Sequence, residues 1–179
     1  ISVNPKDIPT EGITKITSLH TAAADKLGCA VKLIGHTEKI GDKIYAAVSP
    51  YMVPAANPIS HVDGVFNGIL VDANMLGRAL FYGAGAGKLP TASAVVADII
   101  DVLSHKAEER KLPQWRAATA EDIADTADYA CRRCYLIEGC PKCAEKAKAA
   151  FDTEDCVFVE DGKFAVVSRV MTAKEANAA

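Results

Sequence analysis

Residues 81–98 read FYGAGAGKLPTASAVVAD, and this stretch is the most informative part of the chain. An apolar strand end is followed by glycines at the alternate positions 83, 85 and 87, and then by Pro90 and Thr91 at the start of a long apolar segment. Glycine adopts positive φ readily and lets the backbone approach another group closely. A helix that begins directly after such a loop presents unpaired N–H groups and the positive end of its dipole, which suits an anion such as a phosphate. The stretch therefore predicts a strand, a loop and a helix, in which the loop is either a ligand contact or only a tight turn.

The loop fits neither of the two common phosphate-binding signatures. Leu89 rather than Ser or Thr follows Lys88, and position 82 is Tyr, so the P-loop pattern is not met. Lys88 also stands where the GxGxxG pattern needs glycine. Lys88 is still the basic group best placed for a phosphate. Thr91 is expected to be the N-cap of the helix, which does not exclude a ligand contact.

The chain before this loop carries one helix pattern and four strand patterns. The expected elements are, in chain order, a helix from Thr17 or Ser18 to Leu27 that Gly28 ends, strands at 29–36 and 44–48 joined by a turn at 40–43, an irregular stretch with Pro50, Pro54 and Pro58, and strands at 65–72 and 78–82.

Residues 7–101, about half of the chain, closely resemble the later half of the catalytic region of homoserine dehydrogenase. No single motif carries the resemblance, which rests on an ordered set. The set is EGI at 11–13, VKLI at 31–34, VSP at 48–50, NPI at 57–59, VDGVFN at 62–67, and the glycine loop followed by PTASAV at 90–95.

The resemblance implies an oxidoreductase that interconverts L-aspartate 4-semialdehyde and L-homoserine with NAD(P), in threonine and methionine biosynthesis. In that family the cofactor supplies the hydride, a lysine serves the proton transfer, and the protein supplies orientation and electrostatics. The family's nucleotide-binding domain and homoserine-binding segment would lie before Ile1. We therefore carry over no catalytic residue, read the chain as a fragment, and expect it to be inactive alone. By resemblance, Gly87 lies against the nicotinamide nucleotide, with Gly85 and Thr91 as weaker neighbours.

Composition bounds the class of protein. The 179 residues are 50% hydrophobic and 24% charged, which suits one domain or two small ones with a core. The net charge of −3 argues against a nucleic-acid partner, which would need a basic patch. No apolar run approaches a membrane span of roughly 18 residues, and no signal peptide is visible. These features agree with the cytoplasmic location and the small-molecule substrate that the resemblance implies.

The segment from Thr91 to Arg110 is the strongest helix prediction. Its apolar stripe consists of Ala92, Val95, Val96, Ile99, Ile100 and Leu103. In the family resembled, this helix packs against the nucleotide domain. We therefore expect Val96, Ile99 and Leu103 to be buried by another chain or by a repositioned C-terminal segment, in a homodimer or a higher homo-oligomer.

The composition changes from about residue 130. Strands are expected at 134–138, 156–159 and 164–167, with a helix at 141–151, a hairpin turn at 161–162 and a last helix capped by Thr172. The order strand, helix, strand, strand, helix resembles a ferredoxin-like ACT regulatory domain without its last strand, which many homoserine dehydrogenases carry here. The loop after the first strand, EGCP at 138–141, departs from the acidic, proline and glycine pattern near which an ACT effector binds.

Four cysteines form a CxxC-x5-CxxC array, and two more lie apart from it. Four thiolates suit tetrahedral zinc, but the gap of five residues is shorter than that of a zinc ribbon, roughly 15–20 residues. If residues 134–138 form a strand, the first pair of cysteines also points to opposite faces. A structural zinc site, ordinary thiols and a disulfide all stay open, although a disulfide is disfavoured in the cytosol. The array is Cys131, Cys134, Cys140 and Cys143; Cys29 and Cys156 are expected to be small core residues.

The histidines and acidic pairs do not form a convincing catalytic set. His20, His36, His61 and His105 have no helical partner at metal-ligand spacing, and His20 and His105 are expected on solvent faces of helices. Asp63 and Asp72 flank a strand and are interpreted as surface charges.

The sequence thus predicts an α+β fold, with a mixed β-sheet that carries helices on one face and a small, incomplete ACT-like segment after it. The expected division is 1–111 for the substrate and dimerisation part, 112–129 for a linker and 130–179 for the ACT-like segment. The main hypothesis is part of an NAD(P)-dependent homoserine dehydrogenase. The alternatives are an amino-acid-binding or zinc-binding regulatory module that holds subunits together, or a dimerisation scaffold only.

Overall fold

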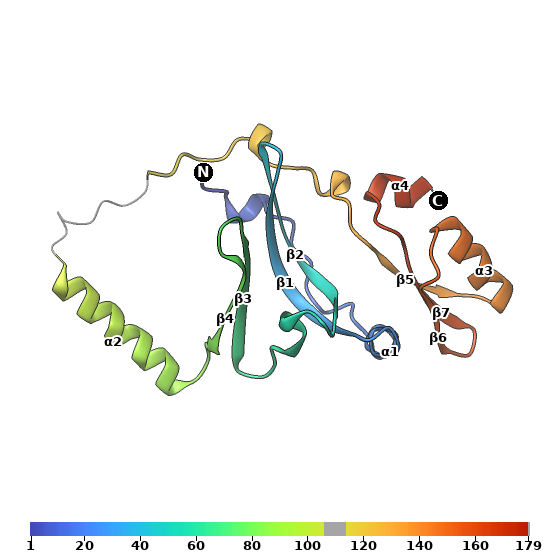
Figure 1. The fold of residues 1–179 in the computed structure, drawn as a ribbon, viewed down its shortest axis with the longest axis horizontal. Coiled ribbons are helices and arrows are strands. Elements are labelled where there is room, and N and C mark those ends of the chain that lie inside the picture. The colour runs from blue at the N-terminus through green and yellow to red at the C-terminus, as the bar shows by residue number, and fades with distance from the viewer. Residues whose placement is uncertain (106–113, 179) are drawn as a thin grey trace. The chain divides into compact units, whose positions relative to one another are not determined.

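The computed structural model describes residues 1–105 and 114–178 (Figure 1). The chain divides into two compact units. The first unit combines Ile1–Ala55 with Arg116–Ala179, and the second unit is Ala56–Trp115. The predicted boundaries at 111 and 130 do not coincide with the boundaries of these units. The predicted division of the chain into 1–111, 112–129 and 130–179 stays a prediction.

The first unit begins with helix α1 (Ser18–Lys26) and a hairpin of β1 (Cys29–Ile40) and β2 (Lys43–Pro54). The helix prediction is confirmed: Thr17 is the N-cap, and Gly28 follows the helix with φ +66°. The hairpin is longer than predicted, because Pro50 and Pro54 belong to β2 rather than to an irregular stretch. A two-stranded ribbon leaves one edge of each strand without a ladder partner, so a proline nitrogen on that edge removes no hydrogen bond.

The C-terminal part of the first unit follows the predicted succession of elements. The strands form a three-stranded antiparallel sheet in the order β5-β7-β6, so β7 is central. Its elements are β5 (Cys134–Glu138), α3 (Pro141–Ala150), β6 (Cys156–Glu160), β7 (Lys163–Val167) and α4 (Ala173–Ala178). The chain also contains short 3₁₀ helices, of which Pro58–His61 belongs to the second unit. The others are Pro5–Asp7, Ala120–Asp122 and Thr126–Asp128.

The apolar core lies in the first unit. Phe164, Ala165 and Val166 of the central strand β7 are fully buried, and Ala23 and Ala24 of α1 are 1% exposed. Helix α1 packs on both β1 and β6, and the Lys26 ammonium donates to the Phe158 carbonyl at 2.6 Å. The hairpin and the C-terminal sheet are therefore joined through α1.

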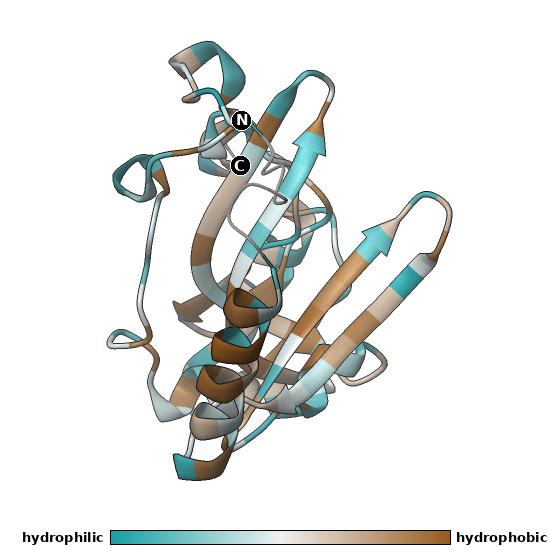
Figure 2. Cartoon of the chain, turned by 90° about the vertical axis from the view of Figure 1, so that its left-hand side faces the viewer, coloured by the Kyte–Doolittle hydropathy of each residue, from teal (hydrophilic) through white to brown (hydrophobic). Residues whose placement is uncertain are grey.

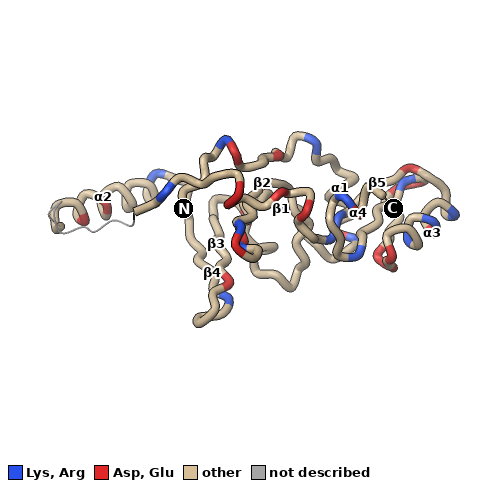
Figure 3. Tube along the Cα trace, turned by 90° about the horizontal axis from the view of Figure 1, so that it is seen from above, with Lys and Arg blue, Asp and Glu red and all other residues tan. Residues whose placement is uncertain are grey.

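The second unit holds β3 (Phe66–Ala73), β4 (Gly77–Ala84) and α2 (Lys88–Ser104). The two strands pair antiparallel, as predicted, with Phe66 opposite Ala84. Among the described residues of this unit only Ser60 is buried. Figure 2 shows the apolar residues along α2, and Figure 3 shows how few charges the helix carries. No helix in the part of the chain that the structure describes is long and apolar enough to cross a membrane.

The predicted cover of α2 stays a prediction. In the single chain, Val96 and Ile99 are each 53% exposed and Leu103 is 82% exposed. The stripe is thus not buried within its own unit. The predicted last turns of this helix, from residue 106 on, lie outside the described residues.

The α+β class is confirmed, but the strands form separate antiparallel sheets rather than one mixed sheet. Parallel pairing within the described residues is limited to isolated bridges at Ser2–Ala117, Thr10–Val48 and Ile44–Ile123. The strand pairs β1–β2 and β3–β4 are each joined by a short turn, and a short turn permits only antiparallel pairing.

Candidate functional site

The glycine loop ends at Gly87, whose backbone conformation only glycine adopts readily. Gly87 has φ +112° and ψ 159° and is the N-cap of α2. This region of backbone space is essentially reserved for glycine, because any side chain strains it. A Cβ at Gly87 would meet only Pro90 Cδ, at 3.7 Å, so space is not what excludes a side chain. Gly87 thus has the positive φ expected of this glycine loop, whereas its contact with a cofactor stays a prediction.

Thr91 is not the N-cap of α2, contrary to the sequence prediction. The helix begins three residues earlier at Lys88, and the Thr91 N–H donates to the Gly87 carbonyl at 3.2 Å. Pro90 is compatible with this earlier start, because a helix has no internal acceptor for the N–H groups of its first turn. Thr91 is therefore one turn into the helix, where its side chain is exposed.

The first turn of α2 presents N–H groups that have no acceptor inside the helix. These belong to Lys88 and Leu89, and no side chain caps the helix. Both residues are exposed, and Lys88 adds an ammonium group at the same end. Such an end can bind a phosphate through backbone donors, the helix dipole and a nearby cation.

Gly85 is accounted for by contacts within the unit. Its N–H donates to the Val65 carbonyl at 3.2 Å. A Cβ at this position would lie 1.8 Å from Nδ2 of Asn67 on the neighbouring strand. Gly85 therefore lets the Asn67 amide approach the loop, and a side chain there would displace it. Sequence reasoning did not assign Asn67, although the residue closes the VDGVFN motif.

The structure brings together two of the four clustered cysteines. Cys140 and Cys143 are hydrogen-bonded with their sulfurs 3.1 Å apart, at the start of α3. Cys134 begins β5, and Cys131 pairs its backbone with Met171. Within the described residues no three His, Cys, Asp or Glu side chains are gathered so as to hold a metal ion. The four-thiolate arrangement that zinc requires is thus not formed here.

The local electrostatics differ between these thiols. Hydrogen bonds from the Cys143 thiol and the Cys143 backbone N–H hold the pKa of Cys140 below its ordinary value. Partial burial instead raises the pKa of the Cys29 thiol, which donates weakly to the Leu27 carbonyl at 3.5 Å. Cys29 and Cys156 lie in strands as predicted, but both are half-buried rather than fully in the core.

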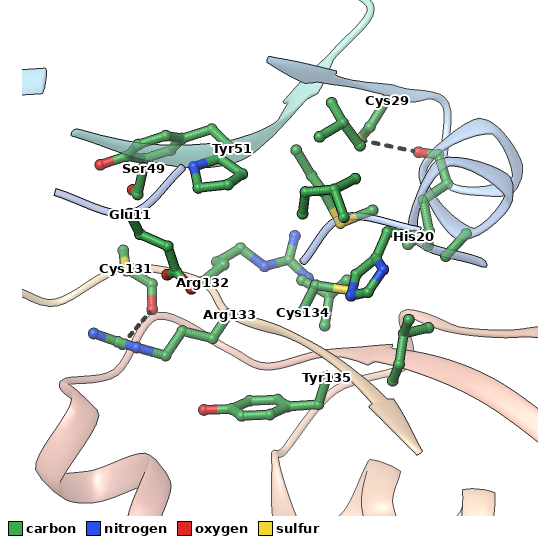
Figure 4. Close-up of a pocket in the computed structure, with 18 of the residues that line it drawn as sticks. Glu11, His20, Cys29, Ser49, Tyr51, Cys131, Arg132, Arg133, Cys134 and Tyr135 are labelled. Carbon is green, nitrogen blue, oxygen red and sulfur yellow. Dashed lines mark hydrogen bonds between the residues drawn. The ribbon is translucent and has the colours of Figure 1, made fainter. Parts of the chain in front are cut away.

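A pocket of about 750 Å³ lies inside the first unit (Figure 4). Side chains from α1, β1, β2 and the segment leading into β5 converge on it, and His20, Cys29 and Tyr51 are among them. Its two arginines are already engaged. Arg132 pairs with Asp155 and donates to the Ser168 carbonyl at 3.0 Å, while Arg133 donates to the carbonyls of residues 129, 131 and 171.

The histidines have structural contacts. His20 was expected on a solvent face, but it is half-buried and its Nδ1 accepts the Thr17 N–H at 3.1 Å, which completes a capping box. His36 lies among Tyr45, Tyr51 and Tyr129, with ring centroids 5.4–6.1 Å away. Burial and a hydrogen bond to Glu38 raise the pKa of Tyr129 to about 12. His105 is 52% exposed, as predicted.

The comparison with family models decides the family. The model described as homoserine dehydrogenase matches residues 1–100, which is more than half of the chain. The chain belongs to the homoserine dehydrogenase family. The matched region contains the β1–β2 hairpin, the β3–β4 hairpin, the glycine loop and most of α2.

Curated relatives agree with this assignment. The chain is 51% identical over 92 residues to a homoserine dehydrogenase of Neisseria gonorrhoeae, a match that covers 51% of the chain and 21% of the relative. It is 36% identical over 105 residues to that of Bacillus subtilis, covering 59% of the chain and 24% of the relative. The matches thus span only about a fifth to a quarter of these homoserine dehydrogenases.

Solved structures extend the likeness beyond the family model. A homoserine dehydrogenase from Thiobacillus denitrificans is 30% identical with a TM-score of 0.67, over 94% of this chain and 42% of that one. One from S. aureus, at 24% identity, shares the fold with a TM-score of 0.71 over 97% of this chain and 44% of that one. The C-terminal elements after residue 130 therefore also fall within a homoserine dehydrogenase fold.

Proposed function

We propose that this chain forms the later part of an NAD(P)-dependent homoserine dehydrogenase that interconverts L-aspartate 4-semialdehyde and L-homoserine. The family assignment supports the reaction class, and the reaction lies in threonine and methionine biosynthesis. The chain holds no residue to which we assign catalysis, so we expect it to be inactive alone. A cytoplasmic location and a homo-oligomeric state belong to the same proposal.

The start of α2 is the part of this chain proposed to touch the cofactor. The observation that carries the proposal is the positive-φ conformation of Gly87 directly before unpaired N–H groups of exposed residues. These donors and Lys88 suit the phosphates or the amide of a nicotinamide nucleotide. Of the three residues proposed from the sequence, Gly87 is the strongest, Gly85 acts through Asn67, and Thr91 offers only its hydroxyl.

NAD(P), when bound, supplies or accepts the hydride. The residues of this chain then bind and orient it. Gly87 keeps side-chain atoms away from the approaching nucleotide, while the N–H groups of Lys88 and Leu89 fix its position relative to α2.

The C-terminal elements are proposed to form an ACT-like module, incomplete by one strand. The β–α–β–β–α succession with β7 between β5 and β6 supports this proposal. An amino-acid effector would bind to such a module, and the departure of the loop at 138–141 from the ACT pattern leaves threonine regulation to be tested by a thermal-shift screen of amino acids.

A pair of glycine variants in the whole enzyme tests the cofactor site. Gly87→Ala should strain the backbone by about 1–3 kcal/mol and weaken NAD(P) binding about tenfold or more, because the loop must shift to relieve the strain. Gly83→Ala is the matched control, since Gly83 lies near the end of β4, four residues before Gly87, has no positive φ, and a Cβ there meets no atom within 4 Å. The measurement is the dissociation constant for NAD(P)H, with the melting temperature recorded in parallel.

Two results would contradict different parts of the proposal. Equal cofactor affinity in both variants would remove Gly87 from the site while leaving the enzyme assignment intact. A whole enzyme that forms no NAD(P)H from homoserine would contradict the proposed reaction itself.

A further inference from the structure

Two thiols at the start of α3 lie within reach of each other and of solvent. The sulfurs of Cys140 and Cys143 are 3.1 Å apart, and both residues are exposed. A disulfide has a sulfur–sulfur distance of about 2.05 Å, so the sulfurs need to approach by about 1 Å to bond. Within the part that the structure describes, no other two cysteine sulfurs are hydrogen-bonded.

The local backbone is arranged for this approach. Cys140 is the N-cap, Pro141 is the first residue of α3, and Cys143 lies one turn along on the same face. Gly139 makes room for the second thiol: a Cβ at position 139 would lie 2.9 Å from Cys143 Cβ and 3.2 Å from its sulfur. A side chain at 139 would therefore push Cys143 away from its present position. The close approach of the two thiols therefore depends on Gly139 as well as on the CxxC spacing.

A structural metal does not explain the pair. Two thiolates supply only half of the tetrahedral set of a structural zinc site. The other candidate ligands, Cys131 and Cys134, are not gathered with them into a site among the described residues.

We propose that Cys140 and Cys143 form a reversible dithiol–disulfide site that exchanges with small disulfides of the glutathione class. This inference is independent of the proposed dehydrogenase reaction. The Cys140 thiolate, which has given its proton to solvent, attacks one sulfur of glutathione disulfide. The disulfide bond of glutathione breaks, one glutathione thiolate leaves, and a mixed disulfide forms on Cys140.

The second thiol completes the exchange. Cys143 loses its proton and attacks the Cys140 sulfur, which expels the second glutathione thiolate. The two leaving thiolates take up the two protons, so two protein thiols are oxidised to one disulfide and one glutathione disulfide is reduced to two thiols. A reducing dithiol reverses both steps.

The small size of the loop favours exchange over structural stabilisation. A disulfide restricts the unfolded chain less when it closes a short loop, and this one would close four residues. Exposed disulfides of this kind are the labile ones. We therefore expect the bond to open and close without unfolding the C-terminal sheet.

The test uses the purified full chain, reduced and then incubated with excess glutathione disulfide. After alkylation of free thiols and digestion, mass spectrometry should find the peptide with Cys140 and Cys143 lighter by two hydrogen atoms and not alkylated. Cys143→Ser should stop at a glutathione adduct on Cys140. Cys140→Ser keeps a good N-cap and should lose the closed form altogether. Cys156→Ser, which alters a half-buried thiol of β6, should close as the unaltered chain does.

Three outcomes would overturn the proposal. The first is alkylation of both thiols to the same extent before and after oxidation. The second is a glutathione adduct on Cys140 of the unaltered chain that never closes. The third is stoichiometric zinc in the purified chain that protects these thiols and is released by a chelator.

Discussion

Both units of this chain are rich in apolar residues, but only the first unit buries many of them. The first unit buries Phe164, Val166 and the alanines of α1. The second unit buries only Ser60 among its described residues, although its strands and α2 are rich in Val, Ile, Leu and Phe. The difference lies in the number of layers. In the first unit, helices pack on a three-stranded sheet, whereas the second offers a two-stranded hairpin and a helix, and a hairpin alone is marginally stable in water.

The comparison shows that apolar periodicity predicts which face will be covered but not what covers it. The stripe of Val96, Ile99 and Leu103 has the spacing of a buried helix face and is more than half exposed in the single chain. An exposed apolar face of this kind indicates an interaction surface. Four predictions test the contrast, from the largest expected effect to the smallest.

Removing a buried aromatic ring should show the largest difference in stability between the two units. Phe164→Ala in β7 should lower the free energy of unfolding by about 3–5 kcal/mol, because it leaves a cavity in the core. Phe81→Ala in β4 is the control, since Phe81 is 61% exposed and should change stability little. The measurement is urea unfolding of both variants. A large loss for Phe81→Ala would show that the second unit is covered after all.

The apolar stripe of α2 is predicted to be buried by another chain or by a repositioned C-terminal segment, and the following variant tests the first of these covers. Ile99→Asn should then weaken self-association about tenfold or more, since burial of an Ile side chain contributes about 1.5–3 kcal/mol. Asp98→Asn, one residue away and off the stripe, is the control. The measurement is sedimentation equilibrium over a range of protein concentrations. An unaltered chain that stays monomeric throughout would refute the predicted cover by a second copy.

A buried hydroxyl of the first unit should matter more than an exposed hydroxyl of α2. Ser168 is fully buried, and its hydroxyl accepts the Arg133 N–H at 3.0 Å and donates to the Arg169 carbonyl at 2.8 Å. Ser168→Ala should cost about 1–3 kcal/mol, because it leaves both backbone groups unpaired. Ser93→Ala on the exposed surface of α2 should be neutral or slightly stabilising, since Ala favours the helix. The measurement is the melting temperature of each variant against the unaltered chain. Equal decreases for the two variants would contradict the predicted difference between the units.

Two bidentate arginine–aspartate pairs give the smallest contrast. Hydrogen bonds from Arg116 and from the Thr119 N–H and hydroxyl hold the pKa of Asp122 well below its usual range. Arg78 lowers the pKa of Asp72 in the second unit through two hydrogen bonds. A carboxyl group whose pKa is lower in the folded state than its unfolded value of about 3.9 stabilises the folded protein above that pH. This stabilisation is lost as the pH falls toward the folded pKa.

Asp122→Asn should therefore flatten the acid limb of the melting-temperature profile below about pH 4, and Asp72→Asn should flatten it less. The second effect is smaller because Asp72 lacks the extra donors that Thr119 gives to Asp122. The measurement is the melting temperature of each variant from pH 2 to pH 6, against the unaltered chain. A larger effect for Asp72→Asn would reverse the predicted order.

Local patterns identified most elements and the glycine loop between β4 and α2. The caps of α1, the turns of both hairpins and the whole C-terminal succession followed from glycine, proline and apolar spacing. The start of α2 did not, because Thr91 looked like a cap while Pro90 is compatible with a helix that begins upstream of it. The extension of β2 through Pro50 was missed, because only the absence of a third strand makes proline tolerable there.

The sequence by itself determined the family, the α+β class and a glycine loop that ends at Gly87, since ordered motifs and glycine positions are properties of the chain. Only the tertiary structure decided which side chains meet. It set the Asn67 amide against Gly85, paired the His20 ring with the N-cap Thr17, and brought Cys140 to Cys143 without gathering Cys131 and Cys134 into the same site. The physical reason is that backbone propensity acts over a few residues, whereas such contacts depend on how separate elements pack and on where the backbone leaves room for a side chain.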